Sequence, residues 1–296
     1  MTRDSPHTLL YILITIMVTF WSANYAAGKI LMREVPSVLA AGLRITLAAI
    51  FMTPLYAWQQ GASSWLNRDW PTLLALGVFG VTMNQFFFMV GLSRTTASHS
   101  ALLIGMTPVF VLLIAAAIRQ ERLTARKALG MFIALGGVLV LNTLPGRDAT
   151  PGAGPTLLGD FYVFIGALAF ALFTVFSKNI STRHSPITVN AWCYFSGAIA
   201  LAPSTLWEAR DFAFARVSVT AWLCLLFMAL FPSTICYLIY SYALTHIPAS
   251  RVAAFSYIQP VLATMLAVVM LGERVTLPLV AGGAVIFSGV YLTERG

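Results

Sequence analysis

Long apolar runs, separated by short polar or proline- and glycine-containing stretches, make up almost the whole chain. Ten of these runs have the length that a membrane-spanning helix needs, about 17–25 residues. Their residues are continuously apolar and show no alternation of period two, so helices are favoured over the strands of a barrel. The expected spans are 9–31, 37–58, 71–92, 98–118, 125–143, 157–178, 187–207, 218–242, 249–270 and 276–293.

Composition places this chain in a membrane. Hydrophobic residues make up 59% of its 296 residues and charged residues only 9%, whereas soluble domains average about 25% charged residues. The first run could be mistaken for a signal peptide, because Arg3 precedes it and small residues follow. We expect a retained first helix, since the run is long and nine more spans follow. The predicted fold class is an all-α integral membrane protein with ten transmembrane helices.

The distribution of basic residues predicts the orientation. With the N-terminus in the cytoplasm, the inner termini and loops hold ten Lys or Arg residues and the outer loops hold seven. The cluster from Arg119 to Lys127 contributes most to this difference, which favours two cytoplasmic termini. The net charge of +8 is therefore mainly a topology signal, and no basic arm for nucleic acid is present.

An internal repeat divides the chain into halves. When the sequence is shifted by 152 residues, 91–141 aligns without a gap to 243–293, and 13 of the 51 pairs are identical. Farther upstream the offset slips slightly, and Lys29 aligns with Lys178. We predict a first repeat of five spans over 1–143, a linker over 144–156 and a second repeat over 157–296. The identical pairs include Pro108/Pro260, Glu121/Glu273, Arg122/Arg274 and Thr124/Thr276.

The number of spans in each half determines their relative orientation. Because five is odd, the second repeat must be inverted in the membrane relative to the first. Inverted repeats are typical of secondary transporters, which bind substrate near the midplane where the repeats meet. A channel is the alternative that the repeat alone leaves open.

Several segments resemble a known family. "FWSANYAAGK", "ASHSALLIGMTPVF", "ASRVAAFSYIQPVL" and the two Glu-Arg blocks resemble EamA repeats of the drug/metabolite transporter superfamily, in its ten-helix form. The resemblance covers nearly the whole chain. Within the family, the chain is most similar to exporters of amino acids, of the YddG aromatic amino acid type. This resemblance implies export of a small metabolite by alternating access, in a bacterial inner membrane.

Polar residues inside spans are the candidate site residues, because they are costly in a membrane. Trp21, Asn24 and Tyr25 share one face of the first helix, where they could contact substrate or a neighbouring helix. Arg44 could bind a substrate carboxylate or phosphate, or instead reach the interface or backbone carbonyls. Further candidates for an aromatic cavity with uncharged polar points are Asn84, Gln85, Trp192, Tyr237, Tyr257 and Gln259.

Two further expectations concern a pair of neighbouring residues and a single histidine. Asn84 and Gln85 are adjacent, so we expect at most one of them to line a cavity fully. The unperturbed pKa of a histidine side chain suits proton transfer, so His99 could be a proton carrier, but a single histidine near a helix end is more often an interfacial hydrogen-bonding residue.

Pro108 and Pro260 are predicted to line the pathway. Each falls near the middle of a span, where proline removes a backbone donor and kinks or breaks a helix. An inert kink is the alternative. The Glu-Arg pairs after these spans are predicted to be structural, with Thr124 and Thr276 capping the next helices. The glycines of the fifth and tenth spans are expected to buttress the core or to pack a homodimer.

All ten acidic residues lie in termini, loops or span ends, so no carboxylate is expected deep in a span. A proton-driven exporter of cationic drugs would normally need one there. We therefore expect a facilitator for amino acids with aromatic or apolar side chains, without obligatory proton coupling. A proton-coupled antiporter of drugs or organic cations is the alternative. No nucleotide-binding loop, metal motif or catalytic triad is present, so neither an enzyme nor a cofactor is predicted.

Overall fold

The computed structural model describes residues 6–60, 69–119, 124–143, 155–247 and 249–294. Within these ranges each of the ten predicted spans is helical, which confirms the all-α fold class, although four of the spans are divided into shorter helices. The undivided spans are α1 (Pro6–Leu31), α2 (Ser37–Gln60), α7 (Ala125–Thr143), α8 (Leu157–Ile180), α9 (Pro186–Ala209) and α14 (Leu277–Glu294). The divided spans are α3 (Trp70–Gly77) with α4 (Asn84–Arg94), α5 (Ala97–Ile104) with α6 (Thr107–Ala117), α10 (Val219–Met228) with α11 (Cys236–His246), and α12 (Ala249–Ala254) with α13 (Gln259–Leu271).

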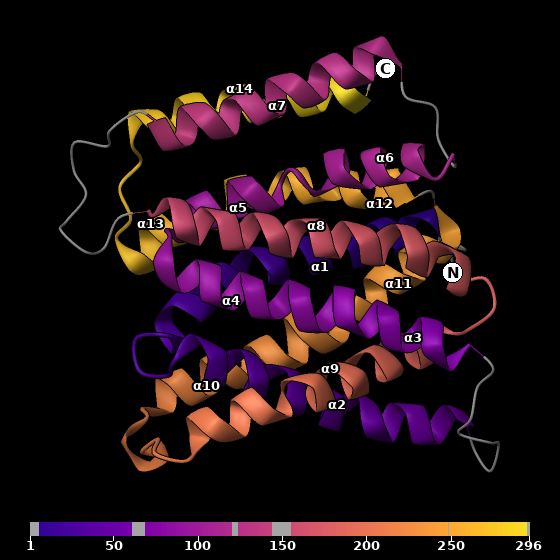
Figure 1. Cartoon of the computed structure of the whole chain (residues 1–296), viewed down its shortest axis with the longest axis vertical. Helices are drawn as coiled ribbons and strands as arrows, with labels where there is room; N and C mark the ends of the chain where they lie inside the picture. The colour runs from indigo at the N-terminus through magenta and orange to yellow at the C-terminus, as the bar shows by residue number, and fades with distance from the viewer. Residues whose placement is uncertain (1–5, 61–68, 120–123, 144–154, 248, 295–296) are drawn as a thin grey trace, which may run out of the picture.

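The helices run back and forth between two ends of one bundle (Figure 1). Helix α1 begins and α14 ends at the same end, on the right of the view, as an even number of crossings requires. At the opposite end, α7 ends and α8 begins; we call this the linker end. Six of the described helical stretches are long and apolar enough to cross a membrane, and two shorter apolar helices accompany them.

The interruptions of the four divided spans are related by the repeat. A π-helix, η1 (Val78–Met83), joins α3 to α4, and a second, η3 (Ala229–Ile235), joins α10 to α11. The fourth span breaks at Gly105–Met106, and the ninth breaks at a short 3₁₀-helix, η4 (Phe255–Ile258). π-Helical turns recur at functional sites, and a membrane tolerates such irregular backbone only beside protein or a cavity.

Pro108 and Pro260 lie directly after the breaks, in the first turns of α6 and α13. A proline is accommodated there because the amide that it lacks would have no partner in the first turn. Gly105 makes room for Pro260, since a Cβ at Gly105 would lie 3.0 Å from the Pro260 Cγ. The predicted break is therefore present, with each proline inside a regular helix start and buried against its neighbours.

Helices α7 and α14 form a separate layer, drawn along the top of Figure 1. A Cβ added to Gly137 would lie 2.6 Å from the backbone nitrogen of Ile286, and one added to Gly289 would lie 2.3 Å from that of Ala134. The glycines therefore bring the two helices together within one chain. Phe132 and Leu139, which are 73% and 65% exposed, lie on the outer surface of this pair.

The predicted caps are confirmed. The hydroxyl of Thr124 accepts a hydrogen bond from the Lys127 amide at 3.2 Å, and that of Thr276 accepts one from the Leu279 amide at 3.4 Å. Each threonine thus satisfies one of the free amides at the start of its helix.

Candidate functional site

A cavity lies between the two repeats at the level of the helix breaks. It holds about 520 Å³ of empty space, counting the part that opens to the outside. Eight of the predicted site residues line it, together with five that the sequence did not single out. The predicted group is Trp21, Asn24, Tyr25, Arg44, Asn84, Gln85, Tyr237 and Gln259, and the additional group is Phe88, Ile104, Thr107, Phe170 and Ser256.

The cavity reproduces the symmetry of the repeat. Positions that align between the halves line it as pairs: Trp21/Phe170, Gln85/Tyr237, Ile104/Ser256 and Thr107/Gln259. The first pair follows the offset that aligns Lys29 with Lys178, and the other three follow the offset of 152. The cavity therefore lies at the interface between the two halves.

Arg44 is the charged residue among the described side chains that line the cavity. It is only 3% exposed, and its Nε donates a hydrogen bond to the Ser233 hydroxyl at 2.7 Å. Its Nη1 has no hydrogen-bond partner, and no ion pair joins Arg44 to a carboxylate within the described part of the chain. A buried charge without a counterion is costly, so this guanidinium is suited to receive an anionic group of a ligand.

Hydrogen bonds behind the cavity wall hold Arg44 in position. Gln85 donates from Nε2 to the Tyr194 hydroxyl at 2.7 Å, and Tyr194 donates to the backbone carbonyl of Ser233 at 2.7 Å. The Ser233 hydroxyl in turn lies 3.3 Å from Oε1 of Gln85. Ser233 belongs to the π-helix η3, so this irregular turn places the partner of Arg44.

A second unpartnered polar atom belongs to Asn24 on α1. This side chain is 6% exposed, and its Oδ1 has no hydrogen-bond partner among the described residues. On the same helix, Tyr25 donates to Oε1 of Gln259 at 3.4 Å, across the two repeats. An unpaired buried acceptor is unfavourable, so the cavity offers a free acceptor on α1 and a free donor on α2.

Aromatic rings form the remaining wall. Trp21 lies 5.8 Å from Phe170 and 6.2 Å from Tyr237, measured between ring centroids, and its Nε1 donates to the Pro232 carbonyl at 3.0 Å. Tyr25 and Phe88 pack edge to face at 5.4 Å. Rings at these separations form a cohesive apolar surface.

Two adjacent side chains both reach the cavity. Asn84 and Gln85 both line the cavity, although neighbours on a regular helix point to different faces. They follow directly on η1, whose wider turns alter the helical phase. Asn84 donates from Nδ2 to the Gly166 carbonyl at 3.0 Å, and its Oδ1 lies 3.0 Å from the Tyr237 hydroxyl.

Five predicted residues lie outside the cavity lining. Pro108 and Pro260 are buried next to Thr107 and Gln259, which line the cavity, so a place for the prolines themselves on the pathway stays a prediction. Trp192 donates to the hydroxyl of Tyr56 at 3.2 Å, and Tyr257 packs within η4. His99 is buried at the start of α5 and contacts Asp160.

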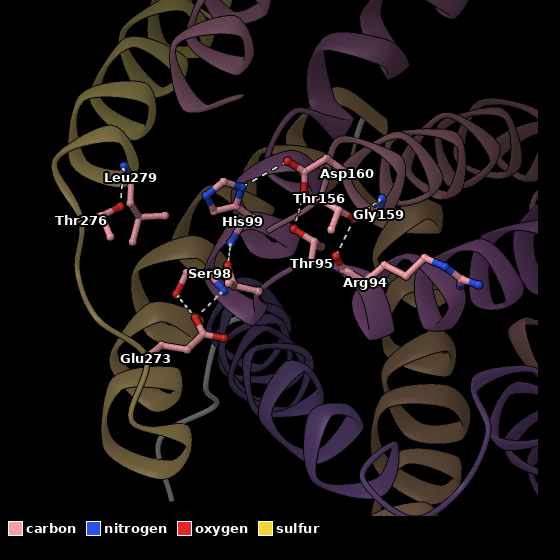
Figure 2. Close-up of polar contacts among 11 residues, drawn as sticks. Arg94, Thr95, Ser98, His99, Thr156, Gly159, Asp160, Glu273, Thr276 and Leu279 are labelled. Carbon is pink, nitrogen blue, oxygen red and sulfur yellow. Dashed lines mark hydrogen bonds and ion pairs between the residues drawn. The ribbon is translucent and has the colours of Figure 1, made fainter. Parts of the chain in front are cut away.

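At the linker end, two carboxylates of the second repeat hold the start of α5, in the first repeat (Figure 2). Asp160 accepts a hydrogen bond from the Thr95 hydroxyl, and its Oδ2 lies 3.1 Å from the His99 Nδ1. Glu273 accepts hydrogen bonds from the Ala97 amide at 2.7 Å and from the Ser98 hydroxyl at 2.7 Å. The glutamate of the repeated Glu-Arg pair therefore connects the repeats.

The ten predicted spans, the inverted repeat and the cavity at its centre are typical of a membrane transporter. The model of the EamA-like transporter family matches residues 8–143 and 157–295, so the chain belongs to this family, within the drug/metabolite transporter superfamily.

Curated relatives share the whole length of the chain. An uncharacterized transporter of Archaeoglobus fulgidus is 27% identical over 96% of this chain and 98% of its own. The uncharacterized transporter YetK of Bacillus subtilis is 24% identical over 96% and 86%. A probable terminal-alkyne amino-acid exporter of Streptantibioticus cattleyicolor is 27% identical over 95% and 92%. A solved crystal structure, 21% identical, superposes with a TM-score of 0.68 over 97% of both chains, which shows the same fold.

Proposed function

We propose that this transporter exports α-amino acids with aromatic or apolar side chains by alternating access. The observation that carries the proposal is Arg44, a buried guanidinium on the cavity wall with a free donor and no carboxylate partner in the described chain. A substrate carboxylate would supply the missing counterion through charge-assisted hydrogen bonds. One similar protein is a probable amino-acid exporter, which agrees with this class of substrate.

The other walls of the cavity fit the rest of an amino acid. The free Oδ1 of Asn24 would accept a hydrogen bond from the substrate ammonium group. Trp21, Phe88 and Phe170 would receive an aromatic or apolar side chain, since rings stack favourably at 4.5–7 Å. The cavity thus offers one complementary feature to each of the three parts of an amino acid.

We propose facilitated diffusion without obligatory proton exchange, and no enzymatic reaction. The lining residues include no Asp or Glu among the described positions, and a carboxylate there is the usual means of exchanging a cation for a proton. A proton-coupled antiporter of organic cations is the second candidate, and Arg44 argues against it because it would repel a cation.

The orientation of the protein, the membrane that holds it and its association into a dimer are also proposals. The basic residues of the loops favour two cytoplasmic termini, and the resemblance to exporters favours a bacterial inner membrane. A homodimer through α7 and α14 would have to use their outer surface, because the glycine stripe already joins these helices to each other. Cross-linking of single cysteines in place of Phe132 would detect such a dimer.

The test is transport by purified protein in liposomes. We expect saturable counterflow of labelled L-phenylalanine that equilibrates without a pH gradient. Competition by unlabelled leucine and tryptophan, and no competition by tetraphenylphosphonium, would support the substrate class. Accumulation of the organic cation driven by a pH gradient would instead establish the antiporter, and absence of flux for a panel of amino acids would overturn the proposal.

A further inference from the structure

The contact between His99 and Asp160 joins two elements that are far apart in the sequence and belong to different repeats. His99 lies in the first turn of α5 and is 5% exposed; Asp160 lies in the first turn of α8 and is 3% exposed. A histidine and a carboxylate that are both buried at a helix–helix contact form an unusual pair in a membrane protein, where ionisable groups are costly.

The geometry assigns different roles to the two ring nitrogens of His99. Its Nδ1 lies 3.1 Å from the Asp160 Oδ2, which favours the tautomer with the proton on Nδ1. Its Nε2 points away from Asp160 (Figure 2) and makes no hydrogen bond within the described part of the chain. This nitrogen is therefore the acceptor at which a proton would bind, and Asp160 would stabilise the resulting imidazolium.

The position of the pair connects it to transport. Helix α5 carries His99 in its first turn and ends at Ile104, which lines the cavity just before the break at Gly105–Met106. A stronger contact between His99 and Asp160 would oppose any opening of the linker end that separates α5 from α8.

The repeat does not place an aligned copy of this pair at the other end of the bundle. The positions that align with His99 and Asp160 are Arg251 and Tyr11, so the sequence provides no second His–Asp pair at the corresponding place. At the other end a histidine and an aspartate also meet, but at positions that do not align with His99 and Asp160. There His184 lies 2.8 Å from Asp69, at the start of α3.

We propose that His99 and Asp160 form a proton-binding site that holds the linker end closed. A proton on Nε2 converts a hydrogen bond between a neutral ring and a carboxylate into an ion pair with a charge-assisted hydrogen bond, which is about twice as strong. The closed state then binds the proton more tightly than the open state, and by linkage a lower pH favours the closed state. This site is separate from the substrate cavity, and the inference stands whatever substrate is carried.

Among the residues that the structure describes, the other charged groups near α5 come from α1, α4 and the loop after α13. Arg94 ends α4, where it donates to the Val90 carbonyl at 3.1 Å and lies over the ring of Tyr162. Glu273, in the loop after α13, interacts electrostatically with Lys29 of α1 and is bound by the start of α5. Arg274 follows Glu273 in this loop, and α14 carries no charged residue between 277 and 292. Glu273 accepts hydrogen bonds from two amides and a hydroxyl at the start of α5.

The first experiment observes the proton directly. Nitrogen-15 NMR of histidine-labelled full-length protein in nanodiscs would follow the four histidines between pH 5 and 9, with H99Q used to assign the His99 signal. We expect this signal to titrate and its midpoint to change in D160N, because the substitution removes the carboxylate charge that lies 3.1 Å from Nδ1. A His99 signal that does not titrate, or whose midpoint is unchanged in D160N, would overturn the proposal.

The second experiment tests the effect on α5. After correction for the intrinsic pH dependence of exchange, amide hydrogen exchange in residues 97–104 should be slower at pH 5.5 than at pH 8.5 in the wild type. The difference should disappear in H99Q and persist in H184Q, which removes the histidine of the pair with Asp69 instead. Equal pH dependence of exchange in H99Q and in the wild type would refute the proposal that protonated His99 holds the linker end closed. Neither experiment needs a substrate, so they remain informative if the proposed amino acid transport is wrong.

Discussion

Replacement of Arg44 by glutamine tests whether the guanidinium binds a substrate carboxylate. Arg44 is 3% exposed, its Nε is held 2.7 Å from Ser233, and its Nη1 is free. One hydrogen bond to a charged group contributes about 1.5–3 kcal/mol, and about 1.4 kcal/mol corresponds to a factor of ten in affinity. R44Q should therefore weaken the binding of L-phenylalanine about 10- to 100-fold.

The assay is a thermodynamic cycle between protein and ligand. Inhibition constants against labelled phenylalanine would be measured for L-phenylalanine and for L-phenylalaninol, which has no carboxylate, in the wild type and in R44Q. We expect the loss to be confined to the amino acid, with phenylalaninol almost unaffected. The thermal stability of R44Q should be maintained, because a buried charge without a carboxylate partner contributes little to folding.

Two results would refute this reasoning. If R44Q weakens both ligands equally, Arg44 supports the shape of the cavity and does not recognise a carboxylate. If R44Q binds phenylalanine like the wild type, the carboxylate lies elsewhere. S233A is the matched control, because it removes the hydrogen-bonding partner of Nε and leaves the charge in place.

Three further predictions concern other parts of the molecule. G137A should destabilise the protein by about 1–3 kcal/mol, since its Cβ would lie 2.6 Å from the Ile286 backbone nitrogen, whereas G136A should be tolerated because nothing lies within 4 Å of its Cβ; melting temperatures in detergent would compare the two. Hydrogen bonds from Ser218 lower the pKa of the Glu34 carboxyl. The contribution of these hydrogen bonds to the free energy of unfolding should therefore be complete above about pH 4.3, the ordinary pKa of a glutamate, and should be lost as the pH falls through the lowered pKa. Unfolding curves between pH 3 and 7 should show this loss of stability for the wild type and a smaller pH dependence for E34Q. N24A should narrow the difference in affinity between L-phenylalanine and 3-phenylpropionate, which lacks the amine; an unchanged ratio in competition assays would argue against Asn24 as the ammonium partner.

The spans and the repeat could be predicted from the sequence because both depend on local patterns. Apolar runs of membrane length specify helices whatever their neighbours are, and the alignment of Pro108 with Pro260 marks equivalent breaks. The proline positions were correct as markers of broken helices, and their role on the pathway stays a prediction. Each proline is the second residue of the helix that follows a break, and the first residue of that helix, Thr107 or Gln259, lines the cavity.

The apolar lining residues could not be recognised one by one. Phe88, Ile104 and Phe170 look like ordinary membrane residues, and only the fold places them at the cavity. The repeat held a usable signal for some of them: Phe170 aligns with Trp21, and Ile104 with Ser256. No comparable signal pointed to the contact between His99 and Asp160, because a pairing between distant helix ends depends on tertiary packing alone.

The cavity is symmetric in position and asymmetric in charge. Its two halves supply aligned residues, yet the guanidinium of Arg44 belongs to the first repeat. The aligned position in the second repeat is Tyr194, at the same offset that aligns Pro36 with Pro186. A molecule anchored through its carboxylate at α2 would keep one orientation relative to the chain while access changes from one side of the membrane to the other. Such a substrate would leave facing the same way as it entered, without having to tumble inside the protein.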